Sequence, residues 1–375
     1  MVLFFIFRVL VTLAGVAIVI STIRSAIQTF ILPRGVSDPT ARFVFLAVRG
    51  VFDLATSRRK TYDGRDHVMA LFGPVALVSL TVSWLGLVIV GYTLIYWGLG
   101  FSTLGKCLLL SGSSIFTLGF VAVMSLRIGV LVFSEAGIGL LLAALLISYL
   151  PAIYNAWSRR ELAVATLEVR AGSPPTAWDL IIRHHRIQGL DAANELWPTW
   201  EAWFLDIEES HTSLSSIVFF RSPQAHRSWV NAAGVILDSA AFFSAVLDVP
   251  RNPRRELCLR AGYIALRRIA KLFRIPFNPN PAPDDQISVT REEFDDVCRL
   301  LADSQVPLKP DLEQAWRDFS GWRVNYDEVL LSLAALTVAP YAPWISDRYS
   351  NWQHPLGTYW HNWVEFLRPQ QDSSE

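Results

Sequence analysis

The most distinctive chemistry of this sequence lies in a cluster of small hydroxyl side chains and glycine. Ser111, Ser113 and Ser114 are followed by the run Thr117-Leu118-Gly119-Phe120-Val121. Hydroxyl and backbone carbonyl oxygens are the ligands that replace the water shell of a monovalent cation in membrane pores. A glycine among them gives the backbone freedom to turn its carbonyl groups toward such an ion. Oxygen groups of this kind suit a cation, and the elements around them must position any such site.

The surroundings of this cluster carry almost no charge. Between residues 68 and 158 the only fully charged side chains are Lys106, Arg127 and Glu135. A helix needs about 20 apolar residues to cross the ~30 Å hydrocarbon core of a bilayer. The runs 69–100 and 128–157 have that length, and so does the run 2–23. These three runs are expected to be membrane-spanning helices.

The run 101–126 is expected to enter the membrane and return without crossing it. It joins the apolar residues of half a helix to the hydroxyl-rich cluster. Non-helical backbone survives at membrane depth only where it is buried in protein or lines water. The carbonyl end of a short helix carries partial negative charge, so it favours a cation at the same place.

Basic residues indicate how the spans are oriented. Residues 1–158 contain 11 Lys and Arg against 5 Asp and Glu, whereas residues 159–375 contain 22 against 28. The basic residues that flank the spans concentrate in the loop 24–67 and at Arg159 and Arg160. Such loops stay on the cytoplasmic side. The pattern predicts a multi-pass protein of the cell (inner) membrane, with its amino terminus outside and its carboxy-terminal region in the cytoplasm.

Two segments of the membrane half allow more than one interpretation. The run 2–23 is favoured as a retained helix over a signal peptide, because it is long, no basic region precedes it and no cleavage site stands out. In the loop 24–67, apolar residues alternate with Arg42, Arg49 and Asp53 at helical spacing. This spacing predicts an amphipathic helix, which lies either on the inner leaflet or against the cytoplasmic domain.

A helix, a re-entrant segment that ends in Thr-x-Gly-aromatic, and a second helix resemble the plan of the two-transmembrane potassium-channel-like pore-loop cation channels. The likeness covers residues 69–158, and residues 117–120 match the first four positions of the family's Thr-Val-Gly-Tyr-Gly filter. Val121 and Ala122 replace the family's second glycine and the acidic residue after it, and Leu109 and Leu110 stand where many members have a bracing aromatic pair. Single-glycine filters of this kind are also similar to those of the Trk/Ktr potassium transporters, which carry four pore segments in one chain.

The resemblance implies a selectivity filter made by Ser114, Thr117, Leu118, Gly119, Phe120 and Val121. Thr117 and the carbonyl groups of Leu118 and Gly119 would form inner sites for a permeant K+ or Na+. Because valine adopts a positive φ only at a cost, the outer part of the filter is expected to be shaped differently here and selectivity to be weaker. One segment cannot surround an ion, so four chains are expected to form a homotetramer around one pore.

The resemblance also implies a pore helix that contains Ser111 and Ser113, and an inner helix that contains Glu135, Gly137 and Gly139. The two glycines either permit a bend during gating or allow helices to pack closely. Glu135 is a functional candidate because it is ionisable and lies within the membrane. A structural role, at the interface or behind the filter, is favoured for it. Leu150, Pro151 and Tyr154 would form a cytoplasmic gate region.

Residues 159–375 predict an all-helical cytoplasmic domain. Helical patterns cover residues 176–194, 195–220, 224–247, 254–274, 290–303, 310–320 and 325–339, and the sequence Gly172-Ser173-Pro174-Pro175 is expected to end the inner helix. The apolar run 229–247 is favoured as a buried core helix over a fourth crossing, because Asp238 lies at its centre. Glu208 and His211 have the spacing of half a carboxylate-bridged metal site, but the other half is missing, so a solvated helix face is favoured.

The fold class predicted is therefore an all-α membrane protein in three parts. Residues 1–68 form a span and a basic linker, residues 69–158 a pore domain, and residues 159–375 the cytoplasmic domain. No catalytic dyad, triad or phosphate loop points to an enzyme or a resident cofactor. Three separated cysteines fit neither a disulfide framework nor a zinc cluster, and no basic block suggests nucleic acid.

The leading functional hypothesis is a pore-forming subunit of a homotetrameric monovalent cation channel. Its expected partners are its own copies, the lipid bilayer and an unknown cytoplasmic regulator. The alternative is a non-conducting membrane receptor or scaffold built on a diverged pore-loop fold.

Overall fold

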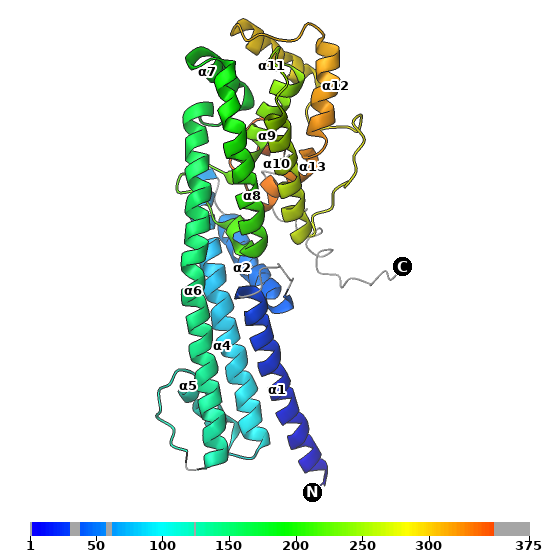
Figure 1. The fold of residues 1–375 in the computed structure, drawn as a ribbon. Coiled ribbons are helices and arrows are strands. Elements are labelled where there is room, and N and C mark those ends of the chain that lie inside the picture. The colour runs from blue at the N-terminus through cyan, green and yellow to red at the C-terminus, as the bar shows by residue number, and fades with distance from the viewer. Residues whose placement is uncertain (1, 31–37, 58–61, 124, 349–375) are drawn as a thin grey trace. The chain divides into compact units, whose positions relative to one another are not determined.

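The computed structural model describes residues 2–30, 38–57, 62–123 and 125–348. Within these ranges the regular structure is helical, apart from one isolated bridge between Leu247 and Leu308 (Figure 1). The all-α prediction is confirmed for this part of the chain. Arg34, Arg58, Arg59 and Lys60 of the predicted basic loop lie outside the described residues, as do residues 349–375 of the predicted cytoplasmic domain.

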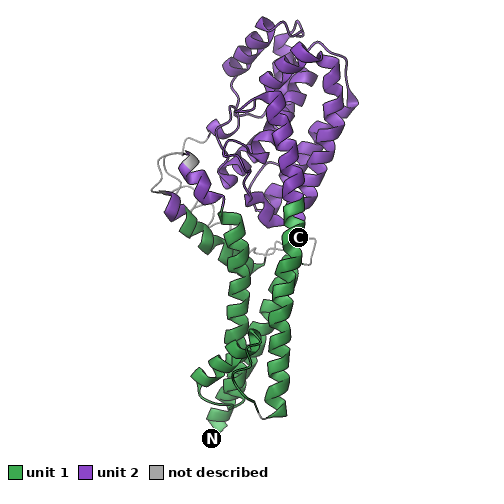
Figure 2. Cartoon of the chain, turned by 90° about the vertical axis from the view of Figure 1, so that its left-hand side faces the viewer, with its two compact units in different colours: residues 1–52, 71–155 green, residues 53–70, 156–375 purple. Residues whose placement is uncertain are grey.

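The chain divides into two compact units, coloured separately in Figure 2. Unit 1 comprises residues 1–52 and 71–155, and unit 2 comprises residues 53–70 and 156–375. The boundary at residue 155 falls inside a single helix of 46 residues, α6 (Leu126–Ala171).

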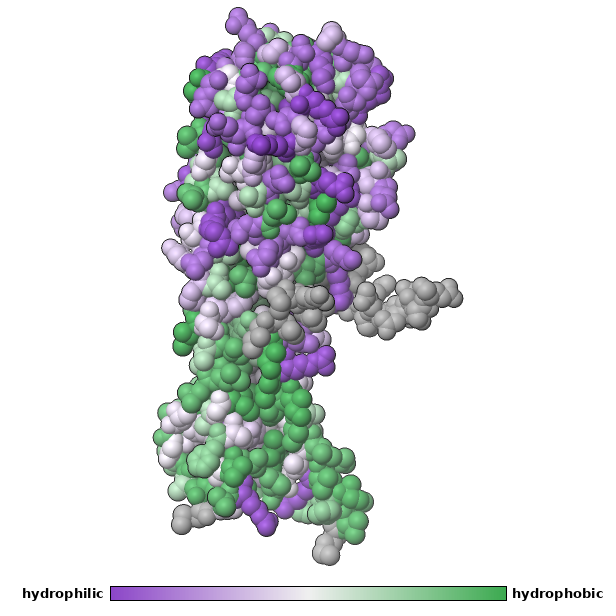
Figure 3. Space-filling model, in the orientation of Figure 1, coloured by the Kyte–Doolittle hydropathy of each residue, from purple (hydrophilic) through white to green (hydrophobic). Residues whose placement is uncertain are grey.

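Unit 1 contains helices that are long and apolar enough to cross a membrane, as the sequence predicts. They are α1 (Val2–Phe30), the helical stretch Gly64–Gly98 that includes α4 (Phe72–Gly98), and α6. Large apolar side chains of these helices, such as Leu3, Val82 and Phe133, are more than 60% exposed, and apolar side chains cover the visible face of this unit (Figure 3). Such a surface suits a lipid environment.

Glycines let α1 and α4 approach each other closely. A Cβ atom built on Gly91 would lie 2.7 Å from Cγ2 of Val19, and one on Gly98 would lie 2.9 Å from the carbonyl oxygen of Arg8. Small residues at such positions are typical of helix pairs in membranes. Trp84 adds a polar contact, since its indole nitrogen donates to Ser25 Oγ over 2.8 Å.

Two further helices, α2 (Pro39–Ser57) and α5 (Leu104–Ile115), are shorter than the three long ones. Helix α2 is amphipathic, as predicted, and its Phe45 and Phe52 rings pack edge-on against Phe72. Most of α2 belongs to unit 1, and Phe43 on its other face is 72% exposed. Helix α5 packs against α4 and is followed by the non-helical residues 116–123.

Unit 2 is a helical bundle with one large apolar core. It begins with α3 (Tyr62–Met69) and the last part of α6. The rest comprises α7 (Ala177–Ile187), η1 (Leu190–Glu195), α8 (Leu196–Ser213), η2 (Ser215–Phe219), α9 (Trp229–Ala245), α10 (Pro253–Leu272), α11 (Arg291–Asp303), α12 (Leu312–Arg323), α13 (Asp327–Thr337) and η3 (Ser346–Arg348).

Helix ends in unit 2 follow recognisable signals. Helix α6 stops at Ala171, and Gly172 takes a φ of 81° before Ser173 and Pro174, at the place where the sequence predicts a stop. Helix α11 begins with a capping box, in which Thr290 and Glu293 each bond the other's backbone N–H. Such local signals explain why the helices of this half lie close to their predicted positions.

Helix α9 is the centre of unit 2. All its residues except Ser244 are buried, and α7, α10, α12 and α13 pack around it. The run that includes α9 is therefore a core helix, which was the favoured interpretation of its apolar composition. Asp238 is the one acidic residue on α9, and Arg323 and Tyr326 both donate hydrogen bonds to its carboxylate.

Candidate functional site

The hydroxyl-rich cluster forms the end of α5 and a tight turn after it. The N–H of Leu118 donates to the carbonyl of Ser113 over 2.8 Å, and the N–H of Thr117 donates to that of Ser114 over 2.9 Å. These two bonds form a Schellman motif, which ends a helix with one residue in the left-handed region. That residue is Thr117, with a φ of 54°. The position normally takes glycine, so a β-branched side chain makes this turn strained.

The segment after the turn presents its backbone and side chains outward in the single chain. Gly119 has a φ of 71°, which L-residues with a side chain rarely adopt, and a Cβ built on it would meet no atom within 4 Å. Phe116, Leu118 and Phe120 are each more than half exposed. The loop lies at the end of unit 1 where α6 begins (Figure 1). The run 117–121 is thus a non-helical strip with an open face.

Glu135 on α6 lies behind α5 and is fully buried. The hydroxyl of Tyr96 on α4 donates to its carboxylate over 2.8 Å, and the hydroxyl of Ser111 on α5 donates to the other carboxylate oxygen. Ser111 Oγ also lies 3.1 Å from the carbonyl of Ile89 on α4. One carboxylate therefore connects α4, α5 and α6 at the back of the hydroxyl-rich cluster.

Sequence reasoning named Glu135 and Ser111 but missed the tyrosines of α4. Tyr92 bonds Ser134 through their hydroxyl oxygens, 2.8 Å apart, one turn from the bond between Tyr96 and Glu135. The available signal was their spacing: two hydroxyl groups four residues apart lie on one face of a helix that is otherwise apolar. A face of this kind needs polar partners when it is buried.

The two glycines of α6 have different surroundings. A Cβ built on Gly139 would overlap the carbonyl oxygen of Ile115 and lie 2.9 Å from Cγ1 of the same residue, whereas one on Gly137 would meet nothing within 4 Å. Gly139 thus allows α6 to approach the last turn of α5 closely. Of the two roles that the sequence allows for this glycine, a bend during gating or close helix packing, this contact is the second. Gly137 has no such packing role in the single chain.

We expect Gly139→Ala to destabilise unit 1 by about 1–3 kcal/mol, because the added methyl group must push α6 away from Ile115. Gly137→Ala is the matched control, since it adds the same methyl group in open space on the same helix. The midpoint of unfolding in a denaturing detergent titration measures both. Equal midpoints for the two variants would contradict the packing role of Gly139.

The other predicted site residues lie in two places. Ser113 and Ser114 are buried in α5, and Ser114 Oγ donates to the carbonyl of Leu110 over 2.7 Å. Leu150, Pro151 and Tyr154 lie on α6, and Leu150 and Tyr154 are 49% and 63% exposed. From Glu135 to Leu150 the helix rises by roughly 22 Å. The structure therefore brings Ser111, Glu135, Gly139 and the end of α5 together and leaves the predicted gate residues apart from them.

His211 on α8 is fully buried, so the prediction of a solvated face is wrong at this residue. Its Nε2 accepts a hydrogen bond from Arg160 Nη1 over 3.3 Å, because a guanidinium only donates. The ring proton is therefore on Nδ1, 3.1 Å from Ser210 Oγ. Burial, together with the positive charge of Arg160, holds the pKa of His211 well below its usual value. Glu208 instead pairs with Arg268 on α10.

The stability of the folded chain is expected to fall below pH ~6.5, because the unfolded chain then takes up a proton that buried His211 does not. In His211→Gln the amide oxygen can still accept a hydrogen bond from Arg160. The slope of the unfolding free energy against pH should therefore fall by up to about 1.4 kcal/mol per pH unit. Unfolding midpoints between pH 7.5 and 5.5 measure the slope. His185→Gln, on the part-exposed face of α7, is the control. A slope equally steep in wild type and His211→Gln would refute the assignment.

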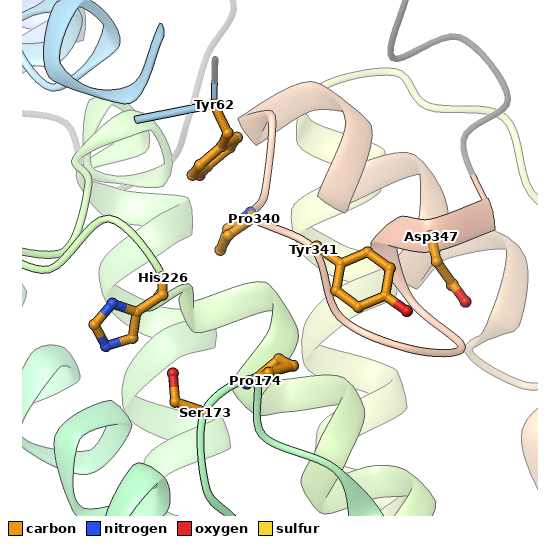
Figure 4. Close-up of a pocket in the computed structure, with 7 residues that line it drawn as sticks. All are labelled: Tyr62, Ser173, Pro174, His226, Pro340, Tyr341 and Asp347. Atoms are coloured by element: carbon orange, nitrogen blue, oxygen red, sulfur yellow. The ribbon is translucent and has the colours of Figure 1, made fainter. Parts of the chain in front are cut away.

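Unit 2 also contains a cavity of about 670 Å³ (Figure 4). Its lining residues are Tyr62, Ser173, Pro174, His226, Pro340, Tyr341 and Asp347. Five of them carry rings, three of which are aromatic (Tyr62, His226 and Tyr341), and Asp347 contributes a carboxylate. In the part of the chain that the structure describes, no group of three or more His, Cys, Asp and Glu residues could hold a metal ion.

Comparisons with known proteins add no relative to this description. A scan against protein-family models, a search of curated proteins and a search of solved structures each found no match for the chain. The features that bear on function are those of unit 1: the short helix α5, the non-helical strip 117–121 and the buried carboxylate of Glu135.

Proposed function

We propose that this chain is the pore-forming subunit of a homotetrameric channel for monovalent cations. The observation that carries the proposal is the position of α5 and the strip 117–121 between two helices that are each long enough to cross a membrane. Backbone that is not helical can exist at membrane depth only against protein or water. A strip with carbonyl groups, Thr117 and a left-handed Gly119 is suited to line a path for K+ or Na+.

The exposed face of the strip supports an assembly of several chains. Phe116, Leu118 and Phe120 are exposed apolar residues in the single chain, and a neighbouring copy would cover them. Four copies around one axis supply a ring of carbonyl oxygens, which one copy cannot. Val121 stands where the pore-loop family has its second glycine, so we propose weak selection between K+ and Na+.

The membrane orientation completes the proposal. Unit 2 lies in the cytoplasm, the strip 117–121 opens toward the outside, and the cell (inner) membrane is the site of action. The support is the excess of basic residues in the loop 24–67 and at Arg159 and Arg160. Unit 2 then gates or assembles the pore.

The proposal is tested by cation flux from liposomes that contain the purified chain. Wild type is expected to pass K+ or Na+, and Gly119→Ala to reduce the flux at least tenfold, because alanine at a φ of 71° costs about 1–2 kcal/mol per subunit. Gly105→Ala is the matched control: this glycine lies in α5, and its added methyl group also meets nothing within 4 Å. Thr117→Ala should change the permeability ratio of K+ to Na+.

Two outcomes would overturn the proposal. The first is a wild-type flux no greater than that of empty liposomes. The second is a flux that Gly119→Ala and Thr117→Ala both leave unchanged. A mass in detergent that corresponds to a monomer or dimer would favour the non-conducting receptor or scaffold.

A further inference from the structure

Side chains from the part of α6 in unit 2 donate hydrogen bonds to backbone carbonyl groups of the connection between α8 and α9 (residues 217–227). Trp157 Nε1 donates to the carbonyl of Arg221 over 3.0 Å. Arg160 is 1% exposed, and it donates to the carbonyls of Ile217 over 2.9 Å and Phe220 over 2.5 Å. A buried guanidinium is costly unless its donors are satisfied. The contacts of Arg160 therefore specify where this connection lies against α6.

A second contact, about two helical turns further along α6, holds the other end of the connection. Glu168 accepts from His226 Nε2 over 2.8 Å and from Arg227 Nε over 2.5 Å. Trp157, Arg160 and Glu168 are spaced so that their side chains all reach the same connection. The connection is thus attached to α6 near both of its ends.

Arg221, in the middle of the connection, reaches two other elements. Its Nη1 donates to Asp66 and, over 3.1 Å, to the hydroxyl of Tyr62, both on α3. Its Nη2 donates to the carbonyls of Thr337 and Val338 at the end of α13, over 2.9 and 3.1 Å. Asp66 and Arg221 have side chains that are 9% and 11% exposed. Arg221 and Asp66 thus form a nearly buried ion pair, and the other nitrogen of the guanidinium is satisfied by backbone carbonyl groups.

These contacts connect α6, which follows the proposed pore segment in the sequence, to α3, which lies just before α4, the helix that precedes that segment. Only residues 70 and 71 separate α3 from α4, and α6 is the helix that contains Glu135 and Gly139. Within unit 2, α3 is bonded to Arg221, and the connection that bears Arg221 is bonded to α6. We name this series of contacts the α3–α6 link; its residues are Asp66, Arg221, Trp157 and Arg160.

We propose that the α3–α6 link is the device by which unit 2 controls conduction, with Arg221 as its central positioning residue. The inference rests on the proposed function. Because Arg221 bonds groups from three segments at once, unit 2 cannot shift α3 relative to the Trp157 region of α6 without breaking buried hydrogen bonds, including the charge-assisted bond to Asp66. The link acts on whether the pore conducts, and it contributes nothing to which ion passes.

Single-channel recording of the full chain in planar bilayers tests the link. Asp66→Asn removes the ion pair but leaves Arg221 its carbonyl partners, whereas Arg221→Gln removes the guanidinium itself. Both are expected to change the open probability at least fivefold, with the unitary conductance and the K+ to Na+ permeability ratio unchanged. The double variant should show the same change as Arg221→Gln alone, because the two residues act as one unit.

Arg159→Gln is the matched control. Arg159 lies beside Arg160 on α6, but it is exposed and pairs with Asp206 on α8, so its loss should leave the open probability unchanged. An unchanged open probability in Asp66→Asn and Arg221→Gln, or a change as large in Arg159→Gln, would overturn the inference. A changed permeability ratio would also overturn it.

Amide hydrogen exchange separates failure of this inference from failure of the proposed function. In Asp66→Asn, exchange should rise in α3 and in the connection 217–227 together, whether or not the protein conducts. A rise confined to α3 refutes the link even if the channel is real. A joint rise in a protein without flux keeps the link as a structural coupling and rejects its role in conduction. Arg221→Lys serves if Arg221→Gln does not fold.

Discussion

Replacement of Arg323 by methionine is expected to lower the free energy of unfolding of the chain by about 3–5 kcal/mol, the largest effect of any single change considered. Arg323 is fully buried in unit 2. It donates to both carboxylate oxygens of Asp238 at 2.5 Å, to Asp327 at 2.7 Å and to the carbonyl of Trp344 at 2.5 Å. Methionine would leave the charge of Asp238 buried on α9 with only Tyr326 as a donor.

Equilibrium unfolding in urea, followed by tryptophan fluorescence, measures this change. Arg291→Met is the control, because Arg291 on α11 forms exposed pairs with Asp295 and Glu313 that are each worth at most about 1 kcal/mol. The double variant Arg323→Met with Asp238→Leu should recover part of the loss, since it removes both charges. A loss below about 1 kcal/mol for Arg323→Met would show that the buried pair is not needed for stability.

Replacement of Glu135 by leucine should abolish cation flux and destabilise unit 1 by about 2–4 kcal/mol. The change removes the acceptor of the Tyr96 hydroxyl and the hydrogen bond by which Ser111 joins α5 to α6, so that Ser111 keeps only the carbonyl of Ile89. Since α5 leads directly into the strip 117–121, the proposed filter loses its support. Glu135→Gln keeps one acceptor oxygen and the same shape, so it should retain an intermediate flux.

Flux from liposomes and the unfolding midpoint are measured together on these variants. Ser134→Ala is the neighbouring control, because it leaves the carboxylate in place and removes the bond to Tyr92 and a local bond to the carbonyl of Leu131, on the more exposed side of α6. If Glu135→Leu conducts like wild type, the carboxylate does not support the strip. If flux disappears equally in Ser134→Ala, the effect belongs to α6 packing in general.

Local signals in the sequence were sufficient for most of the helical architecture. Apolar length alone predicts the three long helices, and the stop at Gly172 needs only glycine and proline. Composition also indicated half a helix at residues 104–110, but α5 continues through the serines and ends only at Ile115. The character of α9 followed from one residue, Asp238, which is too costly to place in lipid without a partner.

Partnerships between distant residues could not be predicted in the same way. Asp238 and Arg323 are 85 positions apart, and Tyr96 and Glu135 are 39 apart. Nothing in one sequence tells which of many arginines or tyrosines will satisfy a buried carboxylate. His211 shows the same limit: its spacing from Glu208 suggested an exposed face, but the packing of α6 against α8 buried it with Arg160. Tertiary packing decides which polar residues are buried.

The close approach of Gly139 to Ile115 has a mechanical consequence. The carbonyl of Ile115 rests on α6 where no side chain intervenes, and Thr117 is only two residues further along. A displacement of α6 of even one ångström would either compress or unseat the last turn of α5, since packed interiors do not deform smoothly. An agent that moves α6 alone would thereby alter the strip 117–121 without touching it.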